Sequence, residues 1–299
     1  MTAAQKHIGV CICTFRRPGL LGSLLSRLEQ QQTNDRFTYS IVVADNDAGQ
    51  SSRQVVSAFA ARSTIATTYS CEPRQNISLA RNEVLRYATG DFVALIDDDQ
   101  YPENDWLAVM LEACEAYRAS GVLGPVRPRF AEPPPRWVID GRFWERPEHR
   151  TGFVLGWRGC ITANVLLRRS VLEGLPQVFD PTFGTGSEDE DFFRRMIGLG
   201  HVFVWCNEGA VCETVPKERC KRTYLLRRAM LNGRNSLKVP VGRVGRLARS
   251  VAAVPAYLLM LPFALLMGQH VFMKYCIRFC HHAGRLLALL RLNPVHQWR

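Results

Sequence analysis

Hydrophobic and polar positions alternate with two different periods in the first half of the chain. Short apolar runs typical of buried strands are separated by segments with helical spacing, such as Leu20, Leu21, Leu24, Leu25 and Leu28. The pattern predicts strands at 8–13, 39–44, 65–71 and 92–96, and helices over the leucine segment, over 78–88 and from about residue 104. Strands that alternate with helices form βαβ units and a mainly parallel sheet.

The pattern weakens after residue 130. Residues 132–137 contain three consecutive prolines and the segment up to Arg150 is polar, which predicts a mobile loop. Strand-like composition returns over 152–171. A helix is then predicted over 188–199 and a strand over 201–205. We therefore expect an α/β domain over residues 1–235 that consists of two halves, at about 1–130 and about 150–235.

Charge is distributed unevenly along the chain. The 299 residues have a formal net charge of +11, yet residues 1–216 hold 22 Lys and Arg against 26 Asp and Glu. Residues 217–299 hold 16 Lys and Arg and a single acid, Glu218. Such a basic segment favours an anionic partner, either nucleic acid or the lipids of a cytoplasmic leaflet. The ten cysteines lack disulfide-framework spacing and no apolar leader follows the polar residues 1–7, so we expect a reducing, cytosolic setting.

The basic segment also contains an apolar stretch. Residues 250–273 carry no formal charge over 24 residues, which is long enough to span a bilayer. Pro255 and Pro262 interrupt the stretch, and a single crossing would place a basic tail outside, against the positive-inside tendency. We therefore expect residues 236–299 to form basic, apolar helices that associate with a membrane by a re-entrant or in-plane segment, with an interfacial helix over 277–292. A packed C-terminal core helix is the alternative.

The clearest chemical signal is Asp97-Asp98-Asp99, directly after the strand at 92–96. Ligands of parallel sheets bind beyond the carboxyl ends of the strands. Three adjacent carboxylates repel one another, and a divalent cation relieves that repulsion. Hard oxygen ligands favour Mg²⁺ or Mn²⁺, which also bind diphosphate oxygens. An acidic turn that caps the next helix is the alternative.

Two further acidic clusters and two basic segments have more than one interpretation. Glu188-Asp189-Glu190-Asp191 could supply catalytic carboxylates, or could only complement the dipole of a helix. Asp45 follows the strand at 39–44 and could accept from a nucleobase or form an Asx turn. Basic residues such as Arg17 and Arg81 suit a diphosphate, and could equally be surface charges.

Taken in order, these motifs resemble those of the family 2 glycosyltransferases. They are Cys13-Thr14-Phe15-Arg16-Arg17, Val42-Val43-Ala44-Asp45-Asn46, Ala80-Arg81-Asn82, Gly90-Asp91-Phe92, Asp97-Asp98-Asp99 and Gly186-Ser187-Glu188-Asp189-Glu190-Asp191. The match spans about residues 7–235 and implies a GT-A fold, a Rossmann-like mixed, mainly parallel sheet flanked by helices. Residues 211–233 are similar to the subgroup that includes a succinoglycan glucosyltransferase. Ser187 departs from the family's glycine, and the Gln/Arg-x-x-Arg-Trp motif of processive members is absent.

The resemblance implies roles for the matched residues. The nucleotide-binding residues would be Thr14, Phe15, Arg17, Asp45, Asn76, Arg81, Asp97 and Asp98. Within that set, Asp45 would contact a uracil or thymine base. Asp99, with Asp97, would bind Mg²⁺ or Mn²⁺, and Asp189 would be the catalytic base paired with Glu188. The acceptor or product phosphate would meet Asp191, Arg222 and Arg227.

The expected activity is therefore an inverting, metal-dependent hexosyl transfer, with donor and acceptor halves at about 1–130 and 150–235. A UDP-sugar donor is favoured, with glucose as the hexose, and the acceptor is expected to be a lipid-linked saccharide in bacterial exopolysaccharide or cell-surface glycan synthesis. The protein would be peripheral or monotopic on the cytoplasmic face of the inner membrane.

Two other classes of function remain as alternatives. A catalytically silent sugar-nucleotide-binding partner of a membrane enzyme would show a broken acidic motif, whereas every acidic motif is present. A nucleic-acid-binding protein would use the basic tail, but the apolar stretch beside that tail argues against it. We therefore expect no nucleic-acid partner.

Overall fold

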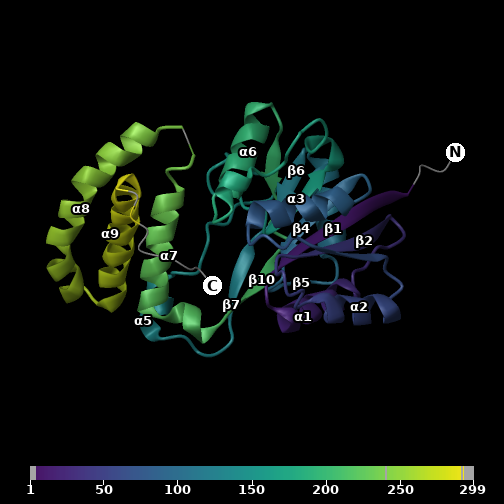
Figure 1. Ribbon diagram of the computed structural model, residues 1–299, viewed down its shortest axis with the longest axis horizontal. Coiled ribbons are helices and arrows are strands. Elements are labelled where there is room, and N and C mark those ends of the chain that lie inside the picture. Colours follow the sequence, from purple (N-terminus) through teal and green to yellow (C-terminus); the bar gives the residue numbers. More distant parts are fainter. Residues whose placement is uncertain (1–4, 240, 291, 293–299) are drawn as a thin grey trace. The chain divides into compact units, whose positions relative to one another are not determined.

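The computed structural model describes residues 5–239, 241–290 and 292, and the chain divides into two compact units (Figure 1). The first unit comprises residues 1–127, 146–184 and 188–213, and the second comprises 128–145, 185–187 and 214–299. The domain boundary predicted at residue 235 stays a prediction, and residue 235 itself is the last of α7 (Arg222–Asn235), a helix within the second unit.

The first unit is built on a seven-stranded sheet in the order β3-β2-β1-β4-β8-β6-β9. Its strands are β1 (Lys6–Thr14), β2 (Phe37–Asp45), β3 (Thr67–Cys71), β4 (Phe92–Asp97), β6 (Gly121–Leu123), β8 (Asn164–Arg168) and β9 (Phe203–Trp205). Strands β3, β2, β1 and β4 run parallel, β8 runs antiparallel to β4 and β6, and β9 runs parallel to β6. The expected mixed, mainly parallel α/β sheet is confirmed.

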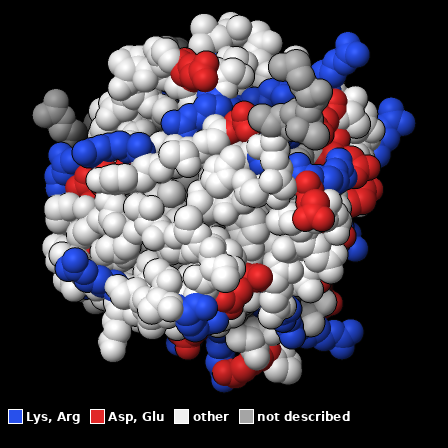
Figure 2. Space-filling view, turned by 90° about the vertical axis from the view of Figure 1, so that its right-hand side faces the viewer, with Lys and Arg blue, Asp and Glu red and all other residues white. Residues whose placement is uncertain are grey.

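Alternation along the strands decides which helices cover each face. In β1, Ile8, Val10 and Ile12 enter one hydrophobic core, whereas Cys11 enters the other. The first core also contains buried residues of α1 (Pro18–Leu28), α2 (Arg53–Arg62) and α4 (Trp106–Ala116). The second contains those of α3 (Ile77–Tyr87) and α6 (Glu188–Gly198). The outer face near β2 and α2 intersperses acidic and basic side chains (Figure 2).

A small three-stranded sheet contains the residues that follow the acidic end of β4. Its order is β5-β10-β7, with bounds β5 (Gln100–Pro102), β7 (Val126–Phe130) and β10 (Val211–Val215). Strand β10 runs antiparallel to β5, so Glu213 lies opposite Gln100. These strands are too short for their sequence patterns to predict them. The pairing of β10 with β5 brings Glu213 beside the turn that follows Asp97.

Two predictions for the middle of the chain are wrong. The segment expected to be a mobile loop forms the helix α5 (Arg136–Gly141), and Val138 and Trp144 are buried in the core of the second unit. These two apolar side chains give the otherwise polar segment a buried face. The three consecutive prolines are typical of a loop, which is why the sequence pattern did not predict this face. Over 152–171 only β8 is a strand, followed by the 3₁₀ helix η1 (Arg169–Val171). Gly152 and Gly159 adopt φ of +85°, which strand geometry excludes.

The second unit contains three longer helices, α7, α8 (Arg243–Leu266) and α9 (Gln269–Leu289), and η3 (Lys217–Cys220). Helix α9 packs against both α7 and α8 (Figure 1). A Cβ atom added at Gly233 would lie 2.0 Å from the carbonyl oxygen of His281, and one at Gly284 would lie 2.2 Å from that of Met230. The α7–α9 contact is therefore as close as backbone atoms allow.

The apolar C-terminal stretch differs from its prediction. Residues 250–273 do not form one element, because α8 ends at Leu266 and α9 begins at Gln269 after Gly268, whose φ is +114°. The helix α8 also continues through Pro255 and Pro262, which were expected to interrupt it. By length and composition α8 could cross a membrane, and 11% of its apolar window is buried. The helix predicted over 277–292 begins earlier and ends earlier than expected, as α9 spans Gln269–Leu289, and its interfacial position stays a prediction.

Candidate active site

Neighbouring parallel strands bring the first set of predicted residues to one edge of the sheet. Thr14 is in register with Asp45 across β1 and β2, and Cys13 is in register with Asp97 across β1 and β4. The carboxyl ends of β1, β2 and β4 therefore meet where Thr14, Asp45 and Asp97 end their strands, at the edge where parallel sheets bind ligands.

One arginine joins the residues that follow the β4 strand. Arg17, at the N-cap of α1, donates to Asp98 Oδ1 at 3.0 Å and to Asp99 Oδ2 at 3.1 Å. The Thr14 hydroxyl donates to Asp98 Oδ2 at 2.8 Å. Asp98 and Asp99 are buried, whereas the side chain of Asp97 is 42% exposed. Asp97 is therefore the carboxylate of the three that is most accessible to a ligand.

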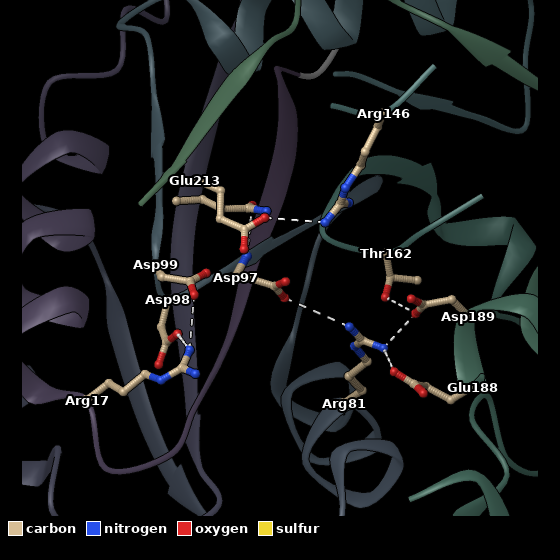
Figure 3. A network of polar contacts seen from close by, with 11 residues as sticks. Arg17, Arg81, Asp97, Asp98, Asp99, Arg146, Thr162, Glu188, Asp189 and Glu213 are labelled. Atoms are coloured by element: carbon tan, nitrogen blue, oxygen red, sulfur yellow. Dashed lines mark hydrogen bonds and ion pairs between the residues drawn. The ribbon is translucent and has the colours of Figure 1, made fainter. Parts of the chain in front are cut away.

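A second arginine joins the two acidic motifs (Figure 3). Arg81 of α3 is 6% exposed, and its guanidinium contacts Glu188, Asp189 Oδ1 at 2.6 Å and Asp97 Oδ1 at 3.8 Å. The Thr162 hydroxyl donates to the same Asp189 oxygen. Although burial alone lowers the pKa of an arginine, the charges of Asp189, Glu188 and Asp97 hold the pKa of Arg81 above its ordinary value. Arg81 thus remains a cation among carboxylates from distant parts of the sequence.

Two of these carboxyl groups bind protons more tightly than usual. Although the side chain of Asp97 is 42% exposed, the protein atoms packed around its carboxyl group partly desolvate it and raise its pKa to about 7, and repulsion from Asp99, Asp189 and Asp98 adds to this rise against the attraction of Arg81. Burial and the adjacent Asp189 raise the pKa of Glu188 to about 7. The side chain of Asp189 is 22% exposed and that of Glu188 is 6% exposed. Asp189 is therefore the more accessible member of the Glu-Asp pair.

Asp45 is held entirely by the protein. Its side chain is buried and accepts from Asp47 N at 3.2 Å, Ser52 N at 2.8 Å and the Tyr69 hydroxyl at 3.2 Å. The hydrogen bond that Asp47 N donates to the Asp45 carboxylate is typical of an Asx turn, which was the alternative interpretation of Asp45. The predicted contact with a nucleobase stays a prediction.

Asn76 also has a structural task. It is the N-cap of α3 and accepts from Leu79 N at 3.2 Å, while its Nδ2 donates to the Pro181 carbonyl at 2.9 Å. This capping places Arg81 one turn into α3. Phe15 packs against the Arg16 guanidinium, 5.1 Å from the ring centre. The nucleotide-binding roles of Asn76 and Phe15 stay predictions.

The residues predicted for the acceptor or product phosphate are not brought to one place within the first unit. Both carboxylate oxygens of Asp191 accept from arginines of its own helix, Arg194 at 2.9 Å and Arg195 at 2.8 Å. Arg222 and Arg227 lie on α7, in the second unit. Asp191 therefore has an evident structural role, and the three phosphate contacts stay predictions.

The carboxylates fit a metal that arrives with its ligand better than a preformed metal cage. Among the residues that the structure describes, no group of three or more His, Cys, Asp or Glu is arranged to hold a metal ion. Mg²⁺ and Mn²⁺ are commonly bound by one or two carboxylates together with substrate phosphates. The exposed Asp97 carboxylate and the neighbouring Asp99 offer hard oxygen donors of this kind.

Sequence reasoning missed four residues of this site (Figure 3). Thr162 holds Asp189, and Gln100 Oε1 accepts from Asp97 N at 3.1 Å. Glu213 Oε2 accepts from Arg146 at 3.3 Å. Gln100 could have been found because it directly follows the three aspartates. Thr162, Arg146 and Glu213 reach the site through tertiary pairing, which local patterns do not encode.

The Ser187 departure has a visible backbone consequence. Ser187 adopts φ of +74°, in the left-handed region that favours glycine. The backbone directly before Glu188 therefore has a conformation that suits glycine, although the residue there is a serine. The entry into α6 is locally strained at this position.

Comparisons with known proteins agree with this geometry. The family model described as glycosyl transferase family 2 matches residues 9–175. The succinoglycan biosynthesis protein ExoM of Rhizobium meliloti (strain 1021) is 33% identical over 98% of this chain and 96% of that protein. Hyaluronan synthase of Pasteurella multocida is 27% identical over 34% of this chain and 11% of that protein.

Solved structures share the fold. The mannosyltransferase PcManGT from Pyrobaculum calidifontis, in complex with GDP-Man and Mn²⁺, superposes with a TM-score of 0.65 at 20% identity, covering 97% of this chain and 89% of that one. S. aureus TarS 1-349 in complex with UDP-GlcNAc gives 0.54 at 13% identity, covering 97% and 93%. The family match over more than half of the chain and the 33% identity to ExoM establish that this chain belongs to glycosyl transferase family 2.

Proposed function

We propose that this glycosyltransferase moves a hexose, with inversion, from a UDP-sugar to a lipid-linked saccharide during exopolysaccharide synthesis. Glucose is the hexose that the sequence resemblance favours, and the similarity to ExoM, a succinoglycan biosynthesis protein, motivates the polysaccharide. The observation that carries the proposal is the position of Arg81, whose guanidinium contacts Asp97 from one acidic motif and Glu188 and Asp189 from the other. One cation thereby joins the proposed diphosphate side of the site to the proposed base.

The ion pairs suggest how donor binding prepares the base. While Arg81 pairs with Asp189, its guanidinium and the Thr162 hydroxyl both bind Oδ1 of this carboxylate. A donor diphosphate offers Arg81 a stronger anionic partner. As Arg81 turns towards the phosphates, the Asp189 carboxylate is freed to meet the acceptor hydroxyl, still held by Thr162.

The transfer itself is a single displacement. The acceptor hydroxyl oxygen attacks the anomeric carbon from the face opposite the nucleoside diphosphate, and its proton passes to Asp189. The bond between the anomeric carbon and the diphosphate oxygen breaks as the glycosidic bond forms. An α-linked donor therefore yields a β-glycoside, and Arg81 and Arg17 lie in the same unit to balance the charge of the leaving group.

A divalent cation completes the proposal. Asp97 and Asp99 would hold Mg²⁺ or Mn²⁺ together with the diphosphate oxygens. The cation supplies charge neutralisation for the departing nucleoside diphosphate. Burial first, and then repulsion from the neighbouring carboxylates, raise the pKa of Asp97 against the attraction of Arg81, and a bound cation would relieve that repulsion.

The second unit is proposed to attach the enzyme to the cytoplasmic face of the inner membrane. The basic residues of 217–299 attract anionic lipids, and α8 provides an apolar surface. Attachment confines the enzyme and a lipid-linked acceptor to one plane, which raises their encounter frequency.

The donor assignment can be tested by saturation-transfer binding with UDP-, GDP- and dTDP-sugars in the presence of Mn²⁺ or Mg²⁺. A UDP-hexose should bind most tightly, with UDP-glucose first. Tighter binding of GDP-mannose than of every UDP-sugar would contradict the proposed donor.

The metal assignment has its own test. Asp99→Ala should abolish the metal-dependent part of donor binding while circular dichroism shows an intact fold. Asp105→Ala is a matched control, because Asp105 precedes α4 and has no assigned part in the site. Unchanged metal dependence in Asp99→Ala would contradict the assignment.

A further inference from the structure

Helix α8 has two faces of different composition. The face that packs on α9 contains buried Ser250 and Ala264. Every exposed residue of α8 after Arg249 is apolar. The larger of these, here called the outer face, are Val251, Leu258, Leu259, Met260, Phe263, Leu265 and Leu266. A helix at the surface of a water-soluble domain normally exposes polar residues, so this face marks a contact with another apolar phase.

The start of α8 indicates which phase that is. Arg243 and Arg249 are exposed in its first two turns, whereas Arg246 donates to the carbonyls of Val239 and Val241. Exposed arginines directly before an apolar face match the boundary between anionic head groups and acyl chains. A second copy packed in parallel would bring the same cations against each other, and an antiparallel copy would offer them a segment whose single acid is Glu218. The charge pattern therefore favours a lipid leaflet over self-association.

The hairpin of α8 and α9 argues against a complete crossing. Helix α9 returns along α8 and carries Lys274 and Arg278. At 1.5 Å per residue, Arg278 lies about 15 Å from the turn at Gly268, which is about half the thickness of a hydrocarbon core. A crossing hairpin would thus place a guanidinium near the bilayer centre, where charge is strongly unfavourable.

The two prolines argue in the same direction. Pro255 and Pro262 have no N–H group, so the carbonyls of Val251 and Leu258 lose their donors four residues later in the helix. All four residues are exposed. Val251 and Leu258 are seven residues apart, as are Pro255 and Pro262, so the four lie on one side of the helix. Inside hydrocarbon these carbonyls would stay unsatisfied, whereas water reaches them at head-group depth.

From these observations we infer that α8 lies in the plane of an anionic leaflet, with its outer face at the head-group boundary and α9 on the protein side. The inference deepens the membrane attachment in the proposed function, on which it rests. It assigns the attachment to named side chains and excludes a crossing.

Flotation of the full-length protein with vesicles tests the surface. Wild type should float with vesicles of phosphatidylcholine and phosphatidylglycerol, and less with phosphatidylcholine alone. Leu259→Glu should weaken partitioning by about tenfold or more, because a leucine that the lipid leaflet would bury is replaced by a charge. Leu199→Glu is a matched control, since Leu199 of the first unit is 68% exposed and Leu259 is 69% exposed. Equal flotation of Leu259→Glu and wild type would overturn the inference.

Depth along α8 separates in-plane from crossing geometry. A fluorescent amino acid is placed by codon suppression at Val251, Leu258 or Leu266, and lipids that carry a quencher at shallow or deep positions are compared. The in-plane helix predicts the same shallow depth at all three positions. A steady change of depth from 251 to 266 would overturn it. A second result would also overturn it: wild type fails to float and self-associates in sedimentation, and Leu259→Glu abolishes that self-association.

Donor binding separates failure of this inference from failure of the proposed function. Saturation transfer from UDP-glucose needs no vesicle, and Leu259→Glu should leave it unchanged. Loss of donor binding with intact flotation would contradict the proposed transferase only. Donor binding without flotation would contradict the membrane surface only.

Discussion

The two units of the molecule depart from the usual distribution of residues in opposite directions. The first unit buries charge, with Arg81 6% exposed and Glu188 5% exposed. The second exposes apolar groups, with Leu259 69% exposed and Leu266 87% exposed. Charged side chains are rarely buried without partners, and large apolar patches are rarely left in water. Both departures are costly to a fold, which makes each a marker of function.

The comparison also shows that the two departures are satisfied differently. The buried charges of the first unit satisfy one another, because Arg81 lies among carboxylates. Among the described residues of the second unit, none covers the outer face of α8, whose side chains stay exposed although α9 packs against this helix. The first site can therefore be tested by removing an internal partner, whereas the second is tested by offering or withholding an external one.

The largest effect is expected from the proposed base. Asp189→Asn keeps the size of the side chain and removes its ability to accept a proton, so the transfer rate should fall by roughly 10²–10⁴-fold while donor affinity persists. Single-turnover transfer measures the rate. Glu190→Gln, the same change at the next residue of α6, is the matched control and should retain most activity. Near-normal transfer by Asp189→Asn would move the role elsewhere.

Removal of the central cation should come next in size. Arg81→Met leaves Glu188 and Asp189 buried without their counter-ion, which costs about 3–5 kcal/mol of unfolding free energy. Urea unfolding measures the loss. The double variant Arg81→Met/Glu188→Gln should recover part of it, because one of the unpaired charges is gone. A loss below about 0.5 kcal/mol would mean that the cluster is already hydrated and does not behave as a buried network.

The packing of the second unit offers a smaller, purely steric test. Gly284→Val places side-chain atoms against the Met230 carbonyl and should destabilise the α7–α9 contact by about 1–3 kcal/mol. In Gly245→Val of α8 the new side chain meets open space, so stability should change by less than about 0.5 kcal/mol. Thermal unfolding of the two variants compares them directly. Equal effects would show that α9 is not held closely against α7.

The pH dependence of Glu188 gives the smallest expected effect. Its pKa rises from the ordinary 4.5 to about 7 on folding, so the folded protein keeps a proton that the unfolded chain loses. The stability from this proton is fully present below about pH 4.5 and is lost as the pH rises through about 7.

Glu188→Gln mimics the protonated group. Its stability relative to wild type should therefore increase across that window, by on the order of 1 kcal/mol. Urea unfolding at several pH values measures the difference. A difference that stays constant from pH 5 to pH 8 would contradict the raised pKa.

The predictability of the two units follows the range of the interactions that form them. The parallel strands and the ends at Thr14, Asp45 and Asp97 could be predicted, because strand periodicity and chemistry lie in the same short segments. The site residues Thr162 and Glu213 could not, since β8 and β10 bring them to place by pairing. Local pattern contains no information about which distant strand becomes a neighbour.

The errors in the second unit have a different origin. The three prolines before α5 conceal the buried positions Val138 and Trp144, because a proline run is typical of loops. Pro255 and Pro262 were expected to break a helix, yet α8 continues through them with both prolines on its exposed side. The ring of an exposed proline meets no neighbouring element, so the helix bears only the lost hydrogen bond. Apolar composition predicted the apolar segment of residues 250–273. The end of α8 within it depends on packing against α9, which the composition does not show.

One measurement tests both halves of the comparison together. Radioactive sugar from UDP-glucose is followed into the organic extract of membranes that contain the lipid-linked acceptor, using wild type, Leu259→Glu and Asp189→Asn. We predict that wild type labels the extract, that Leu259→Glu labels it weakly although it binds the donor normally, and that Asp189→Asn labels it barely although it still binds the membrane. Labelling by Leu259→Glu at the wild-type rate, or by Asp189→Asn at that rate, would contradict the account.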